Sequence, residues 1–544
     1  MRTVYFKDYR KTDDDGYNLY CMFNSLHGQN DVKVVFDKDE YNVYPDYCFE
    51  RNLFISNHGW NGPKRIAALV ENMHGVELDF SDSVLRVHGA MTHIGILNSS
   101  NVTVKNLILE NPRTQIMQTK VVAHGENYID LLKMHGKEQF YLRHNELVTD
   151  YMDGVFFNVW IHQEYDGETA EFLGDFPLGI NVCDERIEEL ENDVIRLYNV
   201  KRFPPIGNII ILNATRRLGA GIFCEDSAEI LCQNVTIHSC FGMGFAAQLC
   251  ENITLSGFNT LKHDGRFYTA NADATHFVSC SGKIVVENCT FECQLDDSLN
   301  IHGMYTKVVR KANNELFVKE MHEAAKGIRI FRVGDRIQIL NPTSLIPYTE
   351  KTITEIEYIN SDLIRLAVAE DTDDVIVGDS AENISYTAEL VYRNNIVRHN
   401  RARGILIASK GKTVIEDCLF ISPGVCVQFE ANGEYWYESG GVNDVTIRNN
   451  TFERCGYFYK EYPLINCVPR RAVEEGKYFH KKISVYGNKF IVKDGSLKLA
   501  HFDNAEHIIF KDNVVAAENN VTAEVELHQV ANAELQNDVK EKRL

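Results

Sequence analysis

The sequence is short of positive charge. It holds 56 lysines and arginines against 77 aspartates and glutamates, which gives a net charge of −21. A polyanion such as nucleic acid is therefore disfavoured as a partner, whereas a neutral or cationic ligand suits an acidic groove. No apolar run approaches the length of a membrane span, and the first residues, MRTVYFKDYRKTDDDGYN, lack the apolar region of a signal peptide. We expect no membrane association and a cytoplasmic location, or a secreted or periplasmic one if a leader has been removed.

Metal-binding cysteine patterns are also missing. None of the 14 cysteines belongs to a CxxC pair or to a Cys/His set with zinc spacing. Many lie inside apolar, strand-like runs, as Cys232 and Cys289 do, and we interpret these as buried free thiols that behave as small hydrophobes.

Helical periodicity is scarce as well, and a short helix is predicted only at 184–194.

What the sequence does contain is a recurring phrase. An Asn or Asp is followed by an alternating strand of β-branched and aromatic residues and then by another turn, as in NVTIHSC from Asn234, KIVVENCTF from Lys283, DVTIRNNTF from Asp444 and KISVYGNKF from Lys482. Imperfect repeats of about 20–25 residues, each a strand and a turn, indicate a β-solenoid whose coils stack by parallel pairing. Inward residues would form apolar ladders, and turn asparagines would stack and hydrogen-bond.

Two segments, 115–200 and 304–390, break this repeat. The second contains alternating strands joined by Asn-Asn, Gly-Asp and Asn-Ser-Asp turns. We predict that both are small antiparallel β-barrel domains inserted into coils of an all-β solenoid. The predicted divisions are therefore an N-terminal solenoid part at 1–114, insertion 1 at 115–200, solenoid coils at 201–303, insertion 2 at 304–390, and C-terminal coils with a tail at 391–544.

Three carboxylates are the first candidates for chemistry. The stretch CQLDDSLNIHGMY sets Asp296 beside Asp297 although like charges repel, and Asp273 precedes Asp297 by about one coil. The three should therefore lie on neighbouring rungs of one face. Clustered carboxylates raise one another's pKa, which suits the acid and base pair of glycoside hydrolysis. Three other interpretations stay open: the aspartates cap turns, they bind Ca²⁺, or the nearby His276 and His302 are structural imidazoles with satisfied hydrogen bonds.

Other polar groups gather later in the chain. QFEANGEYWYESGG brings Glu430, Trp436 and Glu438 together, and aromatic rings beside carboxylates suit sugars. NRARGILIAS supplies Arg401 and Arg403. The alternative for both stretches is structural, namely a loop packed on the solenoid and an ordinary ion pair.

Taken together, these phrases resemble glycoside hydrolase family 110, the α-1,3-galactosidases that remove terminal α-linked galactose from blood-group-B-like and linear glycans. The resemblance rests on DATHF from Asp273, QLDDSLNIHGMY, RARGILIASKGKTVIEDCLF from Arg401 and EANGEYWYESGGVNDVTIRNNTF from Glu430. It implies a right-handed parallel β-helix with β-barrel insertions, and inverting hydrolysis without a metal or other cofactor. It further implies that Asp296 is the general acid and that Asp273 and Asp297 activate water. The substrate contacts expected from the matching phrases are His276, Asn300, His302, Arg401, Arg403, Glu430, Trp436 and Glu438.

We therefore expect an inverting exo-α-galactosidase that acts on an oligosaccharide. A homodimer is compatible with the sequence. One alternative is a polygalacturonase-like hydrolase or a pectate-lyase-like enzyme, which would want a basic subsite for uronic acids. Polygalacturonases share the Asp-Asp pair, but their Gly-His-Gly and Arg-x-Lys phrases are not evident here. An α-galactosidase of sulfated galactan and a non-catalytic glycan-binding solenoid also remain open. The sequence does not determine the aglycone.

Overall fold

The structure is a computed structural model of the chain. It describes residues 1–544 apart from 59–61, 145, 153–154, 160, 176–186, 201, 215–216, 469–473, 493–497, 518–522, 537–538 and 544. No helix in this described part is long and apolar enough to cross a membrane.

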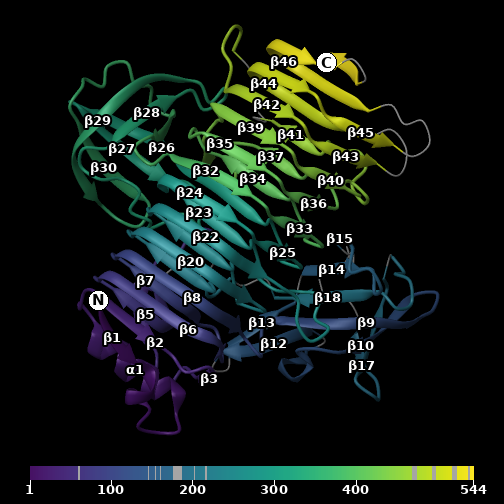
Figure 1. Ribbon diagram of the computed structural model, residues 1–544. Helices are drawn as coiled ribbons and strands as arrows, with labels where there is room; N and C mark the ends of the chain where they lie inside the picture. Colours follow the sequence, from purple (N-terminus) through teal and green to yellow (C-terminus); the bar gives the residue numbers. More distant parts are fainter. Residues whose placement is uncertain are drawn as a thin grey trace.

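The chain winds into a parallel β-helix, as predicted, and its coils stack from the N-terminus to the C-terminus (Figure 1). Its strands form three ladders. The first ladder runs through β5 (Gly62–Glu71), β7 (Thr92–Leu97), β19 (Ile222–Glu225), β21 (Phe245–Gln248), β23 (Thr275–Val278), β26 (Leu299–Ala312), β34 (Ile405–Ala408), β37 (Val427–Phe429), β41 (Ile465–Cys467), β44 (Lys498–Lys511), β46 (Glu524–Leu535) and β47 (Lys540–Arg543). The second runs through β1 (Arg2–Tyr5), β2 (Val32–Val35), β6 (His74–Val87), β8 (Ser100–Glu110), β20 (Ala228–Ile237), β22 (Glu251–Thr260), β24 (Ser281–Glu287), β32 (Ala388–Arg393), β35 (Thr413–Glu416), β39 (Asp444–Arg448), β42 (His480–Tyr486), β44 and β46. The third runs through β3 (Glu40–Val43), β6, β8, β20, β22, β25 (Thr290–Glu292), β33 (Ile396–Arg398), β36 (Leu419–Ile421), β40 (Thr451–Glu453), β43 (Lys489–Val492) and β45 (Val514–Ala517).

Stacked identical residues hold successive coils together. Inside the third ladder, the rings of Phe420, Phe452 and Phe490 stack with centroids 5.3 and 4.8 Å apart. At a turn, the amide of Asn450 donates to Asn488 at 3.0 Å, and Asn488 donates to Asn513 at 2.9 Å. Each rung repeats the same contact with the next, so apolar burial and amide hydrogen bonds both accumulate along the stack.

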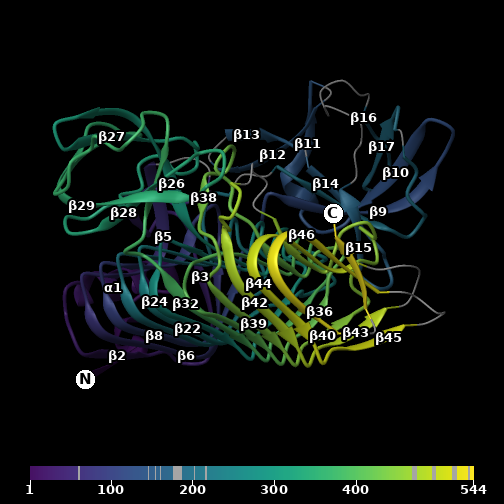
Figure 2. The ribbon, with the colours of Figure 1, turned by 90° about the horizontal axis from the view of Figure 1, so that it is seen from above.

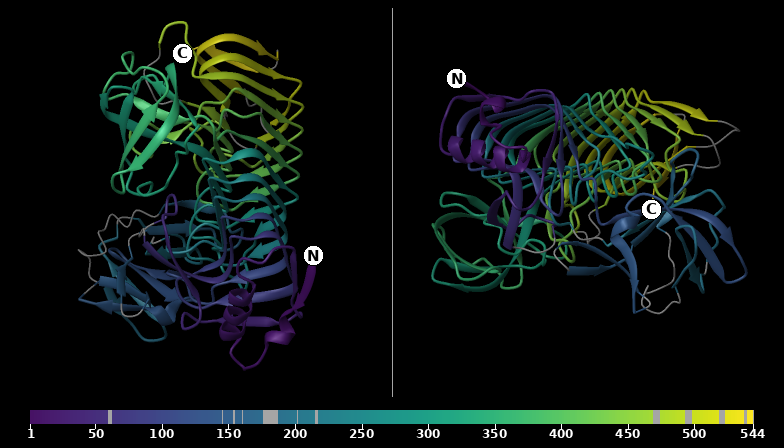
Figure 3. Two further views of the ribbon diagram at one scale, coloured as in Figure 1. Left: turned by 90° about the vertical axis from the view of Figure 1, so that its left-hand side faces the viewer. Right: turned by 90° about the horizontal axis from the view of Figure 1, so that it is seen from below.

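The two insertions lie on the same side of the β-helix (Figures 2 and 3). Insertion 2 is a closed antiparallel barrel in which each strand pairs with the next and the last with the first, in the order β26, β27 (Glu315–Glu320), β30 (Leu363–Val368), β29 (Pro347–Tyr358), β28 (Arg336–Leu340) and β31 (Ser380–Asn383). Its apolar core includes Val308, Leu316, Ile337 and Leu366.

Insertion 1 is an antiparallel sheet in the order β15 (Phe172–Asp175), β14 (Ile161–Tyr165), β18 (Ile209–Asn213), β9 (Ile116–His124), β10 (Tyr128–Lys133), β17 (Val194–Tyr198) and β16 (Ile187–Glu189). Beside it is a second sheet of β11 (Phe140–Arg143), β12 (Glu146–Met152) and β13 (Val155–Asn158). The first sheet includes β18, so insertion 1 extends beyond the predicted end at 200. The segment between β15 and β16 is outside the described residues.

The short helix predicted at 184–194 is wrong in its described part, where 187–189 is strand β16; residues 184–186 are outside that part. The buried Ile187 is followed by the half-buried Glu188 and the exposed Glu189, and pairing with β17 fixes this segment as a strand. Tertiary pairing thus overrides helix propensity here.

A real helix, α1 (Asp15–Leu26), packs against β3 and β5 near the N-terminal end of the stack (Figure 1). The Asp14 carboxylate caps it by accepting from the Tyr17 backbone N–H at 2.9 Å. Its buried face, with Leu19, Met22, Phe23 and Leu26, covers apolar side chains that no further coil would cover.

Candidate active site

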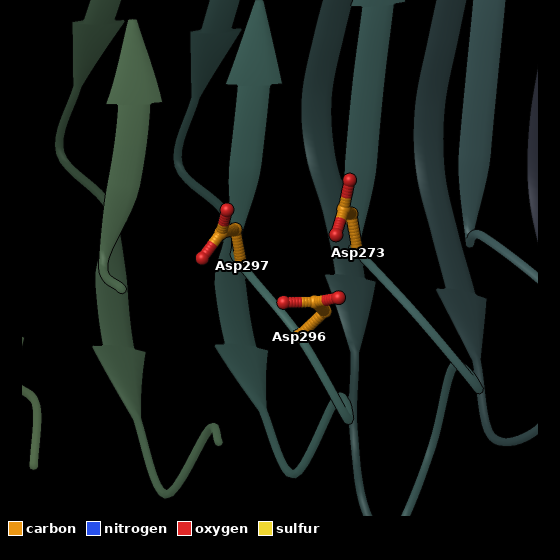
Figure 4. A group of neighbouring side chains, drawn as sticks. All are labelled: Asp273, Asp296 and Asp297. Carbon is orange, nitrogen blue, oxygen red and sulfur yellow. The ribbon is translucent and has the colours of Figure 1, made fainter. Parts of the chain in front are cut away.

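Strand register brings the predicted aspartates together. Thr275 of β23 pairs with Leu299 of β26, so Asp273 and Asp297, each two residues before its strand, occupy equivalent positions in successive coils. The Ala274 backbone N–H donates to the Asp297 carbonyl at 2.9 Å, which continues the pairing into the turn. Three carboxylate oxygens, one each from Asp273, Asp296 and Asp297, lie within 4.8 Å of one another (Figure 4). The spacing in the sequence therefore gave the correct neighbourhood.

Asp296 lies in a bend just before β26, outside the regular strand. In a strand, adjacent side chains point to opposite faces, and the bend removes that restriction. The Asp296 carboxylate is paired with Arg217 at 2.9 Å and lies 3.6 Å from Arg401. Burial raises the pKa of Asp296, but Arg401 and Arg217 overcome this effect and hold it below its usual value. These arginines therefore favour an ionised Asp296.

Asp297 is held by the next coil. Its carboxylate accepts from the Arg403 backbone N–H at 2.8 Å and from the guanidinium Nε and Nη2 at 3.0 and 2.8 Å. Only 1% of the Asp297 side chain is exposed. Burial raises the pKa of Asp297 to about 7, while Arg403 opposes the rise. Asp297 is thus fixed in position and titrates near neutrality.

Asp273 faces histidines instead of arginine. Its Oδ2 lies 2.6 Å from His276 Nδ1, and His276 Nε2 lies 3.2 Å from His302 Nε2. Burial, followed by the charge of Asp296, raises the pKa of Asp273 to about 8. Burial therefore biases Asp273 toward the protonated form, whereas the pKa of Asp296 is lowered.

Two pockets meet at this cluster. The inner pocket, of about 190 Å³, is lined by Asn57, Arg217, Asp273, Asp296, Asp297, Asn300, Arg401, Arg403, Leu406, Glu430, Asn432, Trp436 and Glu438. The outer pocket, of about 290 Å³, is lined by Asp175, Asp296, Arg401, Ala402, Arg403, Gly424, Val425, Gln428, Glu430, Tyr459, Tyr462 and Asn466. Asp296 borders both pockets, whereas Asp273 and Asp297 border only the inner one.

Most of the predicted contact residues line the inner pocket. The Asn300 side chain lines this pocket and is nearly buried, and its buried Oδ1 has no hydrogen-bond partner among the described residues. His276 and His302 line neither of these two pockets. Both rings are buried, and their nitrogens lie against Asp273, each other and the Gly303 carbonyl, so their contact with substrate stays a prediction.

Sequence reasoning missed several lining residues. Arg217 and Asn57 come from coils far earlier in the chain, and Asp175 comes from insertion 1, where it pairs with Arg401 at 2.9 Å. Tyr459 and Tyr462 line the outer pocket from a turn after β40. None of these residues belongs to a motif, and their proximity depends on how loops and an insertion fold over the coils.

The spacing of the three carboxylates would also suit a cation. However, guanidinium groups already pair with Asp296 and Asp297, and Asp273 is biased toward its neutral form. This donor set does not fit a divalent metal well, because its negative charge is already compensated. The absence of a metal from the reaction stays a prediction.

Comparison with known proteins gives matches over most of the chain. Alpha-1,3-galactosidase B of Parabacteroides distasonis is 29% identical over 530 residues, covering 89% of this chain and 82% of that protein. Alpha-1,3-galactosidase A of Shewanella woodyi is 27% identical, covering 85% and 77%. Residues 315–380 match the family model for GLAA-B beta-barrel domain II, within insertion 2. These matches confirm the resemblance that the motifs indicated.

Among solved structures, the chain is similar to the A-module of the Azotobacter vinelandii mannuronan C-5 epimerase AlgE4, with 8% identity, a TM-score of 0.41 and coverage of 100% and 97%. It is also similar to a family 28 exopolygalacturonase of Yersinia enterocolitica, with 9% identity, a TM-score of 0.30 and coverage of 100% and 78%.

Proposed function

We propose, from its kinship with the α-1,3-galactosidases, that the chain is an exo-acting, inverting α-galactosidase that releases terminal α-1,3-linked galactose from oligosaccharides. The observation that carries the proposal is the position of Asp296 where the inner and outer pockets meet. A general acid must protonate the oxygen between the released sugar and its aglycone, so it must lie between their two sites. The inner pocket would hold galactose and the outer pocket the aglycone.

The charge of the site favours a neutral sugar. Each arginine of the inner pocket is already paired with a carboxylate: Arg217 with Asp296, Arg403 with Asp297, and Arg401 with Asp175. A uronic acid or a sulfate ester would need a cation to spare, and the described lining residues offer none. Asn300, Glu430 and Glu438 instead provide oxygens for sugar hydroxyls, and Trp436 provides an aromatic face.

The proposed roles are Asp296 as the acid and Asp273 with Asp297 as the groups that activate water. The acid role requires Asp296 to be protonated when substrate is bound, whereas Arg401 and Arg217 favour its ionised form. Arg401 lies between Asp296 and Asp175, so a shift of its guanidinium toward Asp175 would raise the pKa of Asp296. One carboxylate oxygen from each aspartate lies within 4.8 Å of the other two, which is closer than the roughly 6.5–9.5 Å typical of inverting carboxyl pairs, so spacing alone does not favour inversion.

The test is to incubate the protein with Galα1-3Gal and to follow the anomer of the released galactose by ¹H NMR. Initial β-galactose is the expected result and would support both the activity and inversion. Initial α-galactose would keep the activity but overturn the proposed roles. No galactose release from either this disaccharide or p-nitrophenyl α-galactoside would overturn the proposed function and favour uronic or sulfated substrates.

A further inference from the structure

The hydrogen bonds behind Asp273 fix where protons lie. His302 Nδ1 is 2.7 Å from the Gly303 carbonyl oxygen, which can only accept, so Nδ1 must carry the hydrogen. A neutral His302 then has a bare Nε2. His276 Nε2 lies 3.2 Å from that bare nitrogen, so His276 Nε2 must be the donor. The Gly303 carbonyl group thus determines which nitrogen carries the hydrogen in both His302 and His276.

The same logic reaches the carboxyl group. A neutral His276 that carries hydrogen on Nε2 has a bare Nδ1, and Asp273 Oδ2 lies 2.6 Å from it. Asp273 must therefore supply the hydrogen and be a carboxylic acid. Burial favours neutral His276, since it lowers the pKa of that imidazole well below its usual value. In this state Asp273 cannot accept a proton from water.

A second proton arrangement is available along the same contacts. His302 Nε2 lies 3.6 Å from Glu438 Oε1, and the same oxygen accepts from Asn57 Nδ2 at 3.3 Å. Burial raises the pKa of Glu438, whereas a positively charged His302 or His276, together with Arg403, lowers it below its usual value. Glu438 is therefore the carboxylate that would pair with a protonated His302. A protonated His302 would therefore gain a nearby counter-charge in a buried place.

We propose that Asp273, His276 and His302 form a proton wire that stores the Asp273 proton on His302 beside Glu438. Asp273 Oδ2 gives its proton to His276 Nδ1, and His276 Nε2 gives its proton to His302 Nε2. One O–H bond and one N–H bond break, and two N–H bonds form. Asp273 becomes a carboxylate, His276 stays neutral, and His302 becomes an imidazolium. The inference rests on the proposed function in giving Asp273 the role of base, and it makes His276 and His302 positioning residues.

Other charged and titratable groups face this wire from several elements. They are Asp296, Asp297, Arg217, Arg403 and His58. Arg217 and Arg403 favour an ionised Asp273, and Arg217 also opposes a positive His276, whereas Asp296 opposes ionisation of Asp273 and favours a positive His276. These groups remain in every variant below, so differences between variants report on the wire.

The test compares the pH dependence of kcat/KM for the wild type and His302→Gln on p-nitrophenyl α-galactoside. Glutamine can still accept from His276 Nε2 but cannot take up the proton, so Asp273 must lose it to solvent. The acid limb of the variant should move up by about one pH unit or more, a roughly tenfold loss at about pH 5 that vanishes above about pH 9. His238→Asn, which changes a half-buried histidine outside both pockets, should keep the wild-type profile. An unchanged His302→Gln profile, or one lowered equally at every pH, would overturn the wire.

Ring ¹⁵N shifts of ¹⁵N-histidine-labelled protein give a readout without catalysis. The wild type should show hydrogen on His302 Nδ1 and a His302 Nε2 shift between the bare and protonated values. Asp273→Asn should return that nitrogen to the bare value, because no proton is left to move. A bare His302 Nδ1, or an Nε2 shift insensitive to Asp273→Asn, would overturn the proposal. Because this measurement needs no substrate, failure of the wire and failure of the galactosidase activity can be distinguished.

Discussion

The coils near Asn488 and those near Asp297 use one design with different side chains. Near the C-terminus, Asn450, Asn488 and Asn513 stack at one turn. In the middle of the chain, Asp273, Asp297 and Arg403 stack at equivalent positions before β23, β26 and β34. An amide both donates and accepts, so an asparagine stack satisfies itself. A carboxylate only accepts, so a stack of aspartates needs a cation in the next coil.

The comparison of the two stacks shows that a repeating coil can bring side chains of like charge close together. Each coil places its turn residue beside that of the next coil whatever its chemistry. Where the residue is asparagine, the stack stabilises the fold; where it is aspartate, the stack creates a group of coupled acids. The compensating arginines come partly from the repeat, as Arg403 does, and partly from outside it, as Arg217 does.

The largest effect should come from removing the acid at the pocket junction. Asp296→Asn should lower kcat/KM on Galα1-3Gal by roughly 10²–10⁴-fold, because the poor leaving group needs protonation. On 2,4-dinitrophenyl α-galactoside, whose leaving group does not need it, the loss should be far smaller. Asp297→Asn should lose activity on both substrates. Equal losses of Asp296→Asn on both substrates would contradict the acid assignment.

Breaking the stack at its cation should affect both folding and activity. Arg403→Met leaves Asp297 buried without its partner and should lower the free energy of unfolding by up to about 3–5 kcal/mol. The double variant Arg403→Met/Asp297→Asn should recover much of that stability while remaining inactive. Urea unfolding followed by circular dichroism measures the free energy of unfolding of both variants. A double variant no more stable than the single one would argue against an electrostatic role for the pair.

In the asparagine stack, the corresponding break should affect stability only. Asn488→Ala removes buried amide contacts to Asn450 and Asn513 and should lower the free energy of unfolding by about 1–3 kcal/mol. Galactosidase activity at a temperature where the variant is folded should be unchanged. Gln233→Ala, at an exposed position of β20, is the control and should change neither quantity.

Asp273 should make stability depend on pH. Its folded pKa of about 8 is raised above the ordinary 3.8, so its contribution is full below about pH 3.8 and is lost as the pH rises through about 8. Asp273→Asn mimics the neutral acid and should escape this loss. The melting temperature of the variant should match the wild type at about pH 4 and exceed it at about pH 9. Melting curves that stay parallel across this range would contradict the raised pKa.

The smallest effect should lie in the outer pocket. Tyr462, 48% exposed on its rim, offers a ring to the aglycone. Tyr462→Ala should raise KM for a tri- or tetrasaccharide roughly fivefold, because about 1 kcal/mol of stacking energy is lost. KM for p-nitrophenyl α-galactoside should change little. Tyr348→Ala, an exposed tyrosine of insertion 2, is the matched control. An equal change on both substrates would place the aglycone elsewhere.

The sequence predicted those parts of the molecule that repeat. The β-helix followed from the strand-and-turn phrases, and the proximity of Asp273 to Asp297 followed from their separation by one coil. Insertion 2 was found because its turns are regular hairpin turns. The roles assigned to the carboxylates and their contacts stay predictions.

What the sequence could not give depends on contacts between distant segments. Arg217 and Asp175 reach the site across coils or from an insertion, with no periodicity to reveal them. The sequence motifs suggest His276 and His302 as substrate contacts, and register places them on the same strand face as Asn300, but both rings are buried with nitrogens engaged by Asp273, each other and Gly303. Residue type suggested contact with sugar, whereas burial and hydrogen-bond direction indicate a role behind the reacting groups.

Insertion 2 interrupts a single coil, so Asp297 and Arg403, neighbours in space, are 106 residues apart in the chain. A ribosome adding about 5–20 residues per second needs roughly 5–20 s to make the second after the first. During that interval the nascent chain carries its aspartates without their arginine, and the coil that contains them has no successor to stack on. The barrel, whose strands are local, can form in the same interval. The pairing of Asp297 with Arg403 is thus a late event in synthesis and folding, because the whole barrel must be synthesised before Arg403.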